Sequence, residues 1–92
     1  MTSLRNLNIS YNSLYNSFAK ISFESLQKLT NLEMNCCFIE NIYNITQLRA
    51  LEYLDLSDNK IEEIPENIKN LINLKNLIIC KNEIKNINPV IF

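Results

Sequence analysis

The sequence contains 92 residues, with nine basic and ten acidic side chains and neither histidine nor glycine. This charge balance leaves no basic surface for nucleic acid and no polybasic patch for a membrane. Without histidine there is no Ser-His or Cys-His dyad, and without glycine there is no phosphate-binding loop. We therefore expect one folded domain that is not an enzyme and uses no cofactor.

One spacing of apolar residues recurs four times. The framework Leu-x-x-Leu-x-Leu-x-x-Asn-x-Leu, with some conservative replacements, begins at Leu4, Leu29, Leu51 and Leu74, so that successive copies start 25, 22 and 23 residues apart. Within a copy the spacing changes from two, typical of a strand with one buried face, to three or four, typical of a turn and a short helix. Such a unit has no core of its own, so the copies must stack on one another.

The third copy is the most regular and reads LEYLDLSDNKIEEIPENIKNLINL from Leu51 to Leu74. Its motif and the repeat lengths resemble the leucine-rich repeat family over nearly the whole chain. The resemblance implies an α/β fold: a right-handed solenoid arc with a parallel β-sheet on the concave face and turns or short helices on the convex face. Residues 1–92 would form a single domain with repeats at about 4–28, 29–50, 51–73 and 74–92.

The first two repeats differ in length, and this predicts different outer segments. In the first we expect a strand at 6–10 and a short helix from Ser22 to Gln27, and the longest repeat should be the most helical. In the second we expect a strand at 31–35. Ile42, Ile45 and Leu48 then follow at three-residue spacing, which favours a 3₁₀ helix.

In the third repeat, Leu54 and Leu56 mark the buried face of a strand. Pro65 suits the first position of a short helix, because its missing N–H costs nothing there, and Ile68 and Leu71 should face inward. The fourth repeat has a strand at 76–80. Since glycine is absent, we expect asparagine to occupy left-handed turn positions.

Neither end of the sequence carries the polar cap that usually closes a solenoid. Either the first strand is left uncovered or, as we expect, the chain is part of a longer solenoid. Uncapped ends would also allow two chains to associate with each other.

The cysteines are Cys36, Cys37 and Cys80. Aligned by register, Cys36 and Cys80 lie two strands apart, about 10 Å, whereas a disulfide needs Cα atoms within about 7 Å. A bridge between the adjacent Cys36 and Cys37 would strain the turn. We expect three reduced thiols, and hence a cytoplasmic protein. Without histidine, three thiols lack a regular fourth ligand for zinc, so no metal site is expected.

One column of residues follows the strands, at the asparagine position of the motif: Asn12, Cys37, Asn59 and Asn82. The chain turns there and leaves backbone N–H and C=O groups without a partner in the sheet. A buried amide can both donate and accept, so one such side chain per repeat can satisfy these groups. We expect this column to be structural and not to bind a ligand.

Residues that alternate with the buried leucines should face solvent on the concave side. The candidate protein-binding residues there and on the adjoining turns are Tyr11, Glu33, Asn35, Phe38, Tyr53, Asp55, Ser57, Asp58, Ile78 and Lys81. Acids beside aromatics suit a protein partner with a basic, partly apolar surface, because aromatics anchor interfaces and charges steer encounter. The alternative is a solvated polar face whose contacts are made by other repeats.

The resemblance implies an adaptor or scaffold that binds a protein through the concave face. The third repeat is similar to adaptors of Ras-type signalling, and the 22-residue second repeat to regulatory subunits of serine/threonine phosphatases. Two alternatives are a targeting segment of a larger signalling enzyme (kinase, phosphatase or cyclase) and a secreted recognition protein. The acceptor patterns for N-glycosylation at Asn8 and Asn44 are expected by chance in a chain this rich in asparagine.

Overall fold

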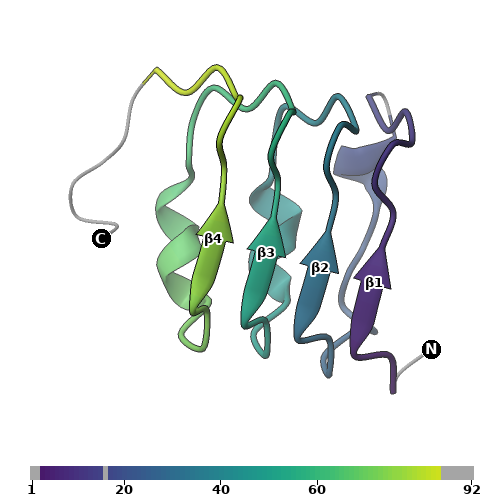
Figure 1. The fold of residues 1–92 in the computed structure, drawn as a ribbon. Helices are drawn as coiled ribbons and strands as arrows, with labels where there is room; N and C mark the ends of the chain where they lie inside the picture. The colour runs from purple at the N-terminus through teal and green to yellow at the C-terminus, as the bar shows by residue number, and fades with distance from the viewer. Residues whose placement is uncertain (1–2, 16, 86–92) are drawn as a thin grey trace.

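Four short strands form a parallel sheet in chain order. The computed structural model describes residues 3–15 and 17–85, and the sheet order is β1-β2-β3-β4. From each of the first three strands the chain runs upward, crosses over the top and descends behind the sheet before the next strand begins, so the coil is right-handed as predicted (Figure 1). The strands are β1 (Asn6–Asn8), β2 (Asn31–Glu33), β3 (Tyr53–Asp55) and β4 (Asn76–Ile78).

The strands are in the register that the repeat alignment predicts. Leu7, Leu32, Leu54 and Leu77 are direct partners across the sheet. The strands are three residues long, where the sequence predicted five. Ladder-like backbone hydrogen bonds nevertheless continue past each strand, for example from the Met34 N–H to the Asp55 carbonyl and from the Cys36 N–H to the Ser57 carbonyl.

The outer wall consists of 3₁₀ helices and turns (Figure 1). The helices are η1 (Phe18–Lys20), η2 (Tyr43–Gln47) and η3 (Glu66–Asn70). The prediction of a 3₁₀ helix after Ile42 is confirmed by η2. Pro65 lies one position earlier than predicted, as the extended residue that precedes η3. Its fixed φ and missing N–H suit that position, and Ile68 and Leu71 are buried as expected.

The outer segment of the first repeat contradicts its prediction. Its helix η1 has three residues, fewer than η2 or η3, and 22–28 form turns and coil instead of a helix. The Ser22 hydroxyl accepts only one long hydrogen bond, 3.4 Å from the Glu24 N–H. The extra length is used to bury two large rings, Phe18 and Phe23, whose centroids are 5.9 Å apart.

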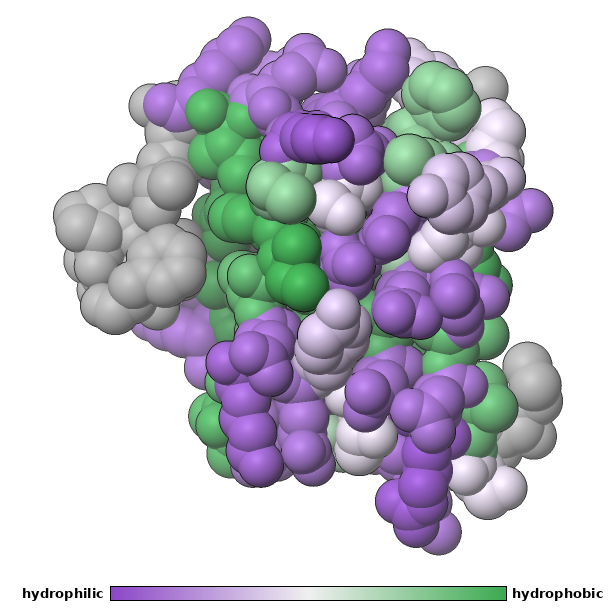
Figure 2. Space-filling model, viewed as in Figure 1, coloured by the Kyte–Doolittle hydropathy of each residue, from purple (hydrophilic) through white to green (hydrophobic). Residues whose placement is uncertain are grey.

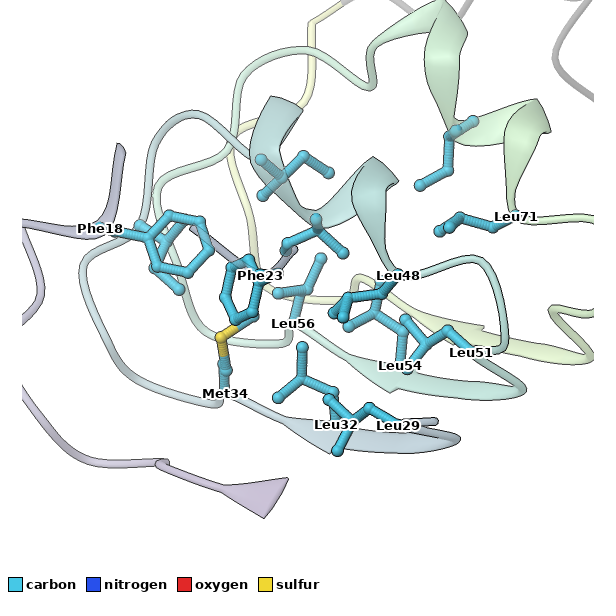
Figure 3. Close-up of a cluster of buried hydrophobic side chains, with 14 of the residues drawn as sticks. Phe18, Phe23, Leu29, Leu32, Met34, Leu48, Leu51, Leu54, Leu56 and Leu71 are labelled. Atoms are coloured by element: carbon cyan, nitrogen blue, oxygen red, sulfur yellow. The ribbon is translucent and has the colours of Figure 1, made fainter. Parts of the chain in front are cut away.

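The core lies between the sheet and the outer wall (Figure 3). From the sheet side it contains Leu29, Leu32, Met34, Leu51, Leu54 and Leu56, and from the outer wall Ile42, Ile45, Leu48, Ile64, Ile68 and Leu71. Phe18 and Phe23 lie at the Met34 end of this layer (Figure 3). Because each of the first three repeats contributes to both walls, stacking gives one continuous core.

Each repeat turns sharply at a residue with left-handed backbone. These residues are Tyr11, Cys36, Asp58 and Lys81, with φ between 56° and 63°, and Phe38 adds a second such residue in the second repeat. None is asparagine, so the expectation that asparagine replaces glycine at these turns is wrong. A side chain with a Cβ is disfavoured there by about 1 kcal/mol or more. The turn is held instead by the asparagine column one residue further on.

Candidate functional site on the sheet face

The candidate site is the outward face of the sheet, called here the sheet face. Outward side chains come from the first and third residue of each strand: Asn6, Asn8, Asn31, Glu33, Tyr53, Asp55, Asn76 and Ile78. This set contains two carboxylates and no basic residue. Glu33 and Asp55 are direct partners on β2 and β3. Like charges opposite each other are unfavourable without a counterion or partner.

Asp55 and Ser57 are oriented differently from the prediction of a solvated row. Each is only 8% exposed. The Asp55 Oδ1 atom accepts hydrogen bonds from the Ser57 N–H at 3.1 Å and from the Ser57 hydroxyl at 2.8 Å. Short polar side chains bond readily to the backbone of a nearby turn. Here these bonds hold Asp55 and Ser57 against each other, and both side chains are largely shielded from solvent. They hold the turn and offer little surface to a partner.

Glu33, Asn35, Tyr53 and Ile78 are half-buried and form the middle of the sheet face. The Asn35 N–H donates to the Ser10 hydroxyl at 3.0 Å. Partial burial raises the pKa of the Tyr53 phenol above its ordinary value of 10.0, and the neighbouring carboxylates of Asp55 and Glu33 raise it further. The phenol therefore stays protonated at neutral pH and can donate a hydrogen bond.

The most exposed predicted residues lie on the turns above the strands. Tyr11 is 79% exposed and Phe38 is 50% exposed, and Asp58 and Lys81 are also exposed. The Lys60 ammonium lies 5.8 Å from the centroid of the Phe38 ring, within the range of a cation–π contact. Figure 2 shows a mostly hydrophilic sheet face, with its strongest hydrophobic colour beside β4.

The asparagine column links neighbouring repeats. The Asn59 Nδ2 atom lies 2.9 Å from the carbonyl oxygens of Met34 and Leu56, and its Oδ1 atom accepts from the N–H groups of Cys37 and Ile39. Asn82 makes equivalent contacts in the next repeat: its Nδ2 atom donates to the Leu56 carbonyl, and its Oδ1 atom accepts from the Ile61 N–H. In the second repeat, the Cys37 thiol lies 3.3 Å from the Ile9 carbonyl. These contacts give the column a structural role.

Sequence reasoning missed a groove away from the sheet face. It lies between residues 40–43 of the second repeat and residues 60–65 of the third, and has a volume of about 460 Å³. The available signal was the repeat register, because Glu40 and Glu62 occupy the same position in successive copies. Their proximity depends on how two coils stack, which the sequence pattern alone does not specify.

Comparison with known proteins agrees with this architecture. A family model described as Leucine Rich Repeat matches residues 50–71. The structure is similar to the crystal structure of an internalin from Listeria monocytogenes str. 4b F2365, with a TM-score of 0.63 and 26% sequence identity over 98% of this chain and 32% of the internalin. The chain is a leucine-rich-repeat protein. It spans about a third of the internalin's length. No curated protein matches the sequence.

Leucine-rich repeats generally mediate protein–protein interaction through an extended surface of this kind. The fold and the internalin-like structure point to an interaction module and not to an enzyme. Among residues 3–15 and 17–85, no group of three or more acidic or cysteine side chains is placed to hold a metal ion. No helix in that same part of the chain is long and apolar enough to cross a membrane.

The cysteines of this leucine-rich-repeat protein are free thiols: Cys36 is half-buried, Cys37 is buried and Cys80 is exposed. Partial burial and the nearby Asp58 carboxylate raise the pKa of the Cys36 thiol above its ordinary value of 9.0. Cys36 is therefore a poor nucleophile at neutral pH. The Asn44 amide donates to the carbonyls of Phe18 and Ile21, so one of the two glycosylation patterns has its acceptor amide engaged in the fold.

Proposed function

We propose that this leucine-rich-repeat segment is an adaptor-type module that binds a protein partner through the sheet face. The observation that carries the proposal is the adjacent pair Glu33 and Asp55 on a face whose strand positions contain no basic side chain. The buried Asp55 adds its negative charge to that of the half-buried Glu33, and Glu33 is the carboxylate that a positive group can reach. A basic side chain on a partner would supply it.

Exposed aromatics beside the acids support the same proposal. Tyr11 and Phe38 project from the turns at the upper edge of the sheet, and Tyr53 lies in the middle of the face. Rigid aromatic rings commonly anchor interfaces, because they bury a large area at little cost in conformational entropy. A partner with basic and apolar groups side by side would match this arrangement. Three free thiols favour a cytosolic setting for it.

The test is quantitative affinity capture with the wild-type chain and two variants. One variant combines Tyr11→Ala, Glu33→Lys and Tyr53→Ala, all on the sheet side, and leaves Asp55 intact because Asp55 holds a turn. The control combines Ser25→Ala, Lys28→Ala and Asn70→Ala at exposed outer positions. We expect a defined set of proteins to be lost with the first variant and retained with the control. A captured set that both variants retain equally would contradict the proposal.

A second candidate is a targeting segment within a larger signalling enzyme. In the internalin the matched region is 32% of the chain, so a segment of this kind can lie within a longer protein. In this case the sheet face would bind the protein toward which the enzyme is directed. Sequencing the complete transcript distinguishes the two: a catalytic domain joined to these repeats favours the enzyme, and further repeats alone favour the adaptor.

A further inference from the structure

The groove between the second and third repeats is separate from the sheet face. Residues 40–43 form one side and Lys60, Glu62, Glu63 and Pro65 form the other. These residues follow the strands and lead toward η2 and η3, where the chain passes from the sheet to the outer wall (Figure 1). Its volume of about 460 Å³ lies within the range of about 300–1,000 Å³ typical of ligand sites.

The charge of the groove is unbalanced. Glu40, Glu62 and Glu63 line it together with one basic residue, Lys60. Lys85 lies 3.3 Å from the Glu62 carboxylate, and Lys60 extends toward the Phe38 ring. In the part of the chain that the structure describes, Glu40 and Glu63 form no ion pair. The ten remaining residues contain neither lysine nor arginine.

Apolar groups complete the groove. The buried Ile42, the half-buried Pro65 and the ring of Tyr43, which is 58% exposed, lie beside the carboxylates. The Tyr43 hydroxyl accepts a 3.3 Å hydrogen bond from the Asn67 amide, which links the ring to η3. An aliphatic stem packs against such groups while its charged end reaches the carboxylates. A cation near the ring gains a further cation–π contact.

We propose that this groove receives an arginine or lysine side chain from an extended basic segment of a protein partner. Charge complementarity and the apolar wall identify the occupant: a long side chain with an aliphatic stem and a cationic end. Arginine fits best, because its guanidinium can donate to two carboxylates at once. The groove would then be a second contact, independent of binding at the sheet face.

The test uses a ¹⁵N-labelled chain and two probe peptides. One is acetyl-Ala-Arg-Ala-Arg-Ala-amide, and the other has citrulline in place of both arginines, which removes the charge but keeps the shape. We expect the arginine peptide to produce saturable amide shifts at 40–43 and 60–64, and the citrulline peptide to produce none. Absence of saturable shifts, or shifts confined to the sheet face, would overturn the proposal.

Charge-matched variants separate this site from general attraction. Glu40→Gln with Glu63→Gln removes two carboxylates from the groove, and Glu24→Gln with Glu52→Gln removes two that lie neither in the groove nor at the strand positions of the sheet face. We expect the first pair to weaken arginine-peptide binding about tenfold or more and the second to change it less than about twofold. Equal weakening by both pairs would show non-specific attraction and overturn the proposal. These side chains are at least partly exposed, so the spectra should otherwise stay unchanged.

Discussion

The centre of the stack and the first repeat carry the same motif but differ in how well it is buried. In the centre, Leu29, Leu32, Leu51 and Leu54 have no exposed surface. In the first repeat, the equivalent Leu4 and Leu7 and the following Ile9 and Leu14 are only half-buried. A leucine at this position is therefore buried completely only where a coil covers it on both sides.

The asparagine column shows the same difference in its hydrogen bonds. Asn59 bonds to backbone groups of its own repeat and of the preceding one, and is itself buried. Asn12 is exposed and donates only to the carbonyls of Ile9 and Ser10 in its own repeat. The contribution of a motif residue thus depends on the neighbouring repeats more than on its residue type.

The largest expected effect is loss of a central leucine. Leu54→Ala should lower the free energy of unfolding by about 2–5 kcal/mol, because it removes a fully buried side chain and leaves a cavity. Its register equivalent in the first repeat, Leu7→Ala, should cost clearly less, because that side chain already contacts water. Urea denaturation followed by circular dichroism measures both. Equal losses would contradict the comparison between centre and first repeat.

Substitutions in the asparagine column should also lower the free energy of unfolding, but by a smaller amount. Asn59→Leu should cost about 1–3 kcal/mol, because buried N–H groups of Cys37 and Ile39 lose their acceptor. Asn12→Leu should cost less, because Asn12 is exposed and its partners lie within one repeat. The denaturation midpoints of the two variants check this. Hydrogen exchange at Cys37 and Ile39 adds a local readout, and unchanged protection there in Asn59→Leu would reject the assignment.

The repeat pattern predicted the fold because stacking leaves few alternatives. Residues spaced at two and then at three or four can bury their apolar sides only against a neighbouring coil. The register of Leu7, Leu32, Leu54 and Leu77 followed directly from the alignment of the copies. The sequence also predicted that the Asn59 amide bonds to backbone groups, since the turn after each strand leaves N–H and C=O groups without a partner in the sheet.

The repeat pattern predicted which side of the sheet a side chain lies on better than it predicted how exposed that side chain is. It placed Asp55 and Ser57 on the sheet face, but the Asp55 carboxylate accepts from the Ser57 N–H and from the Ser57 hydroxyl, and both residues are buried. It also suggested asparagine for the left-handed turns, whereas residues as different as Tyr11 and Lys81 occupy them. Position in the repeat dictates this backbone conformation, and stacking overrides the preference of the individual residue.

The repeat pattern did not predict the side-chain contacts between neighbouring coils. In the first repeat, Gln47 of the next coil accepts the Phe23 N–H at 3.0 Å, which supports a turn where a helix was predicted. The groove likewise combines Glu40 and Glu63, which are far apart in sequence and belong to different repeats. Such contacts depend on the relative position of two outer segments of unequal length. The repeat alignment describes their order but not that geometry.

The smallest effect concerns the charge at the centre of the sheet face. The pKa of Tyr53 is raised by partial burial and then by Asp55 and Glu33, so its neutral form is favoured in the folded state. This contribution to stability is fully present below the ordinary pKa of 10.0 and is lost as the pH rises through the higher folded value. Ultraviolet titration of tyrosinate, compared with Tyr53→Phe, should show the Tyr53 component with a midpoint above 10.0.

Glu33→Gln should lower that midpoint, because it removes one of the two neighbouring negative charges. Glu24→Gln, in the first repeat, removes a charge of the same kind away from the sheet and serves as its control. If both substitutions moved the Tyr53 midpoint equally, the shift would reflect net charge. A response to Glu33 alone shows that the carboxylates act locally, where the central strands bring them together. The same local field is what a basic partner would encounter on the sheet face, so this titration measures the electrostatic part of the proposed interaction without the partner.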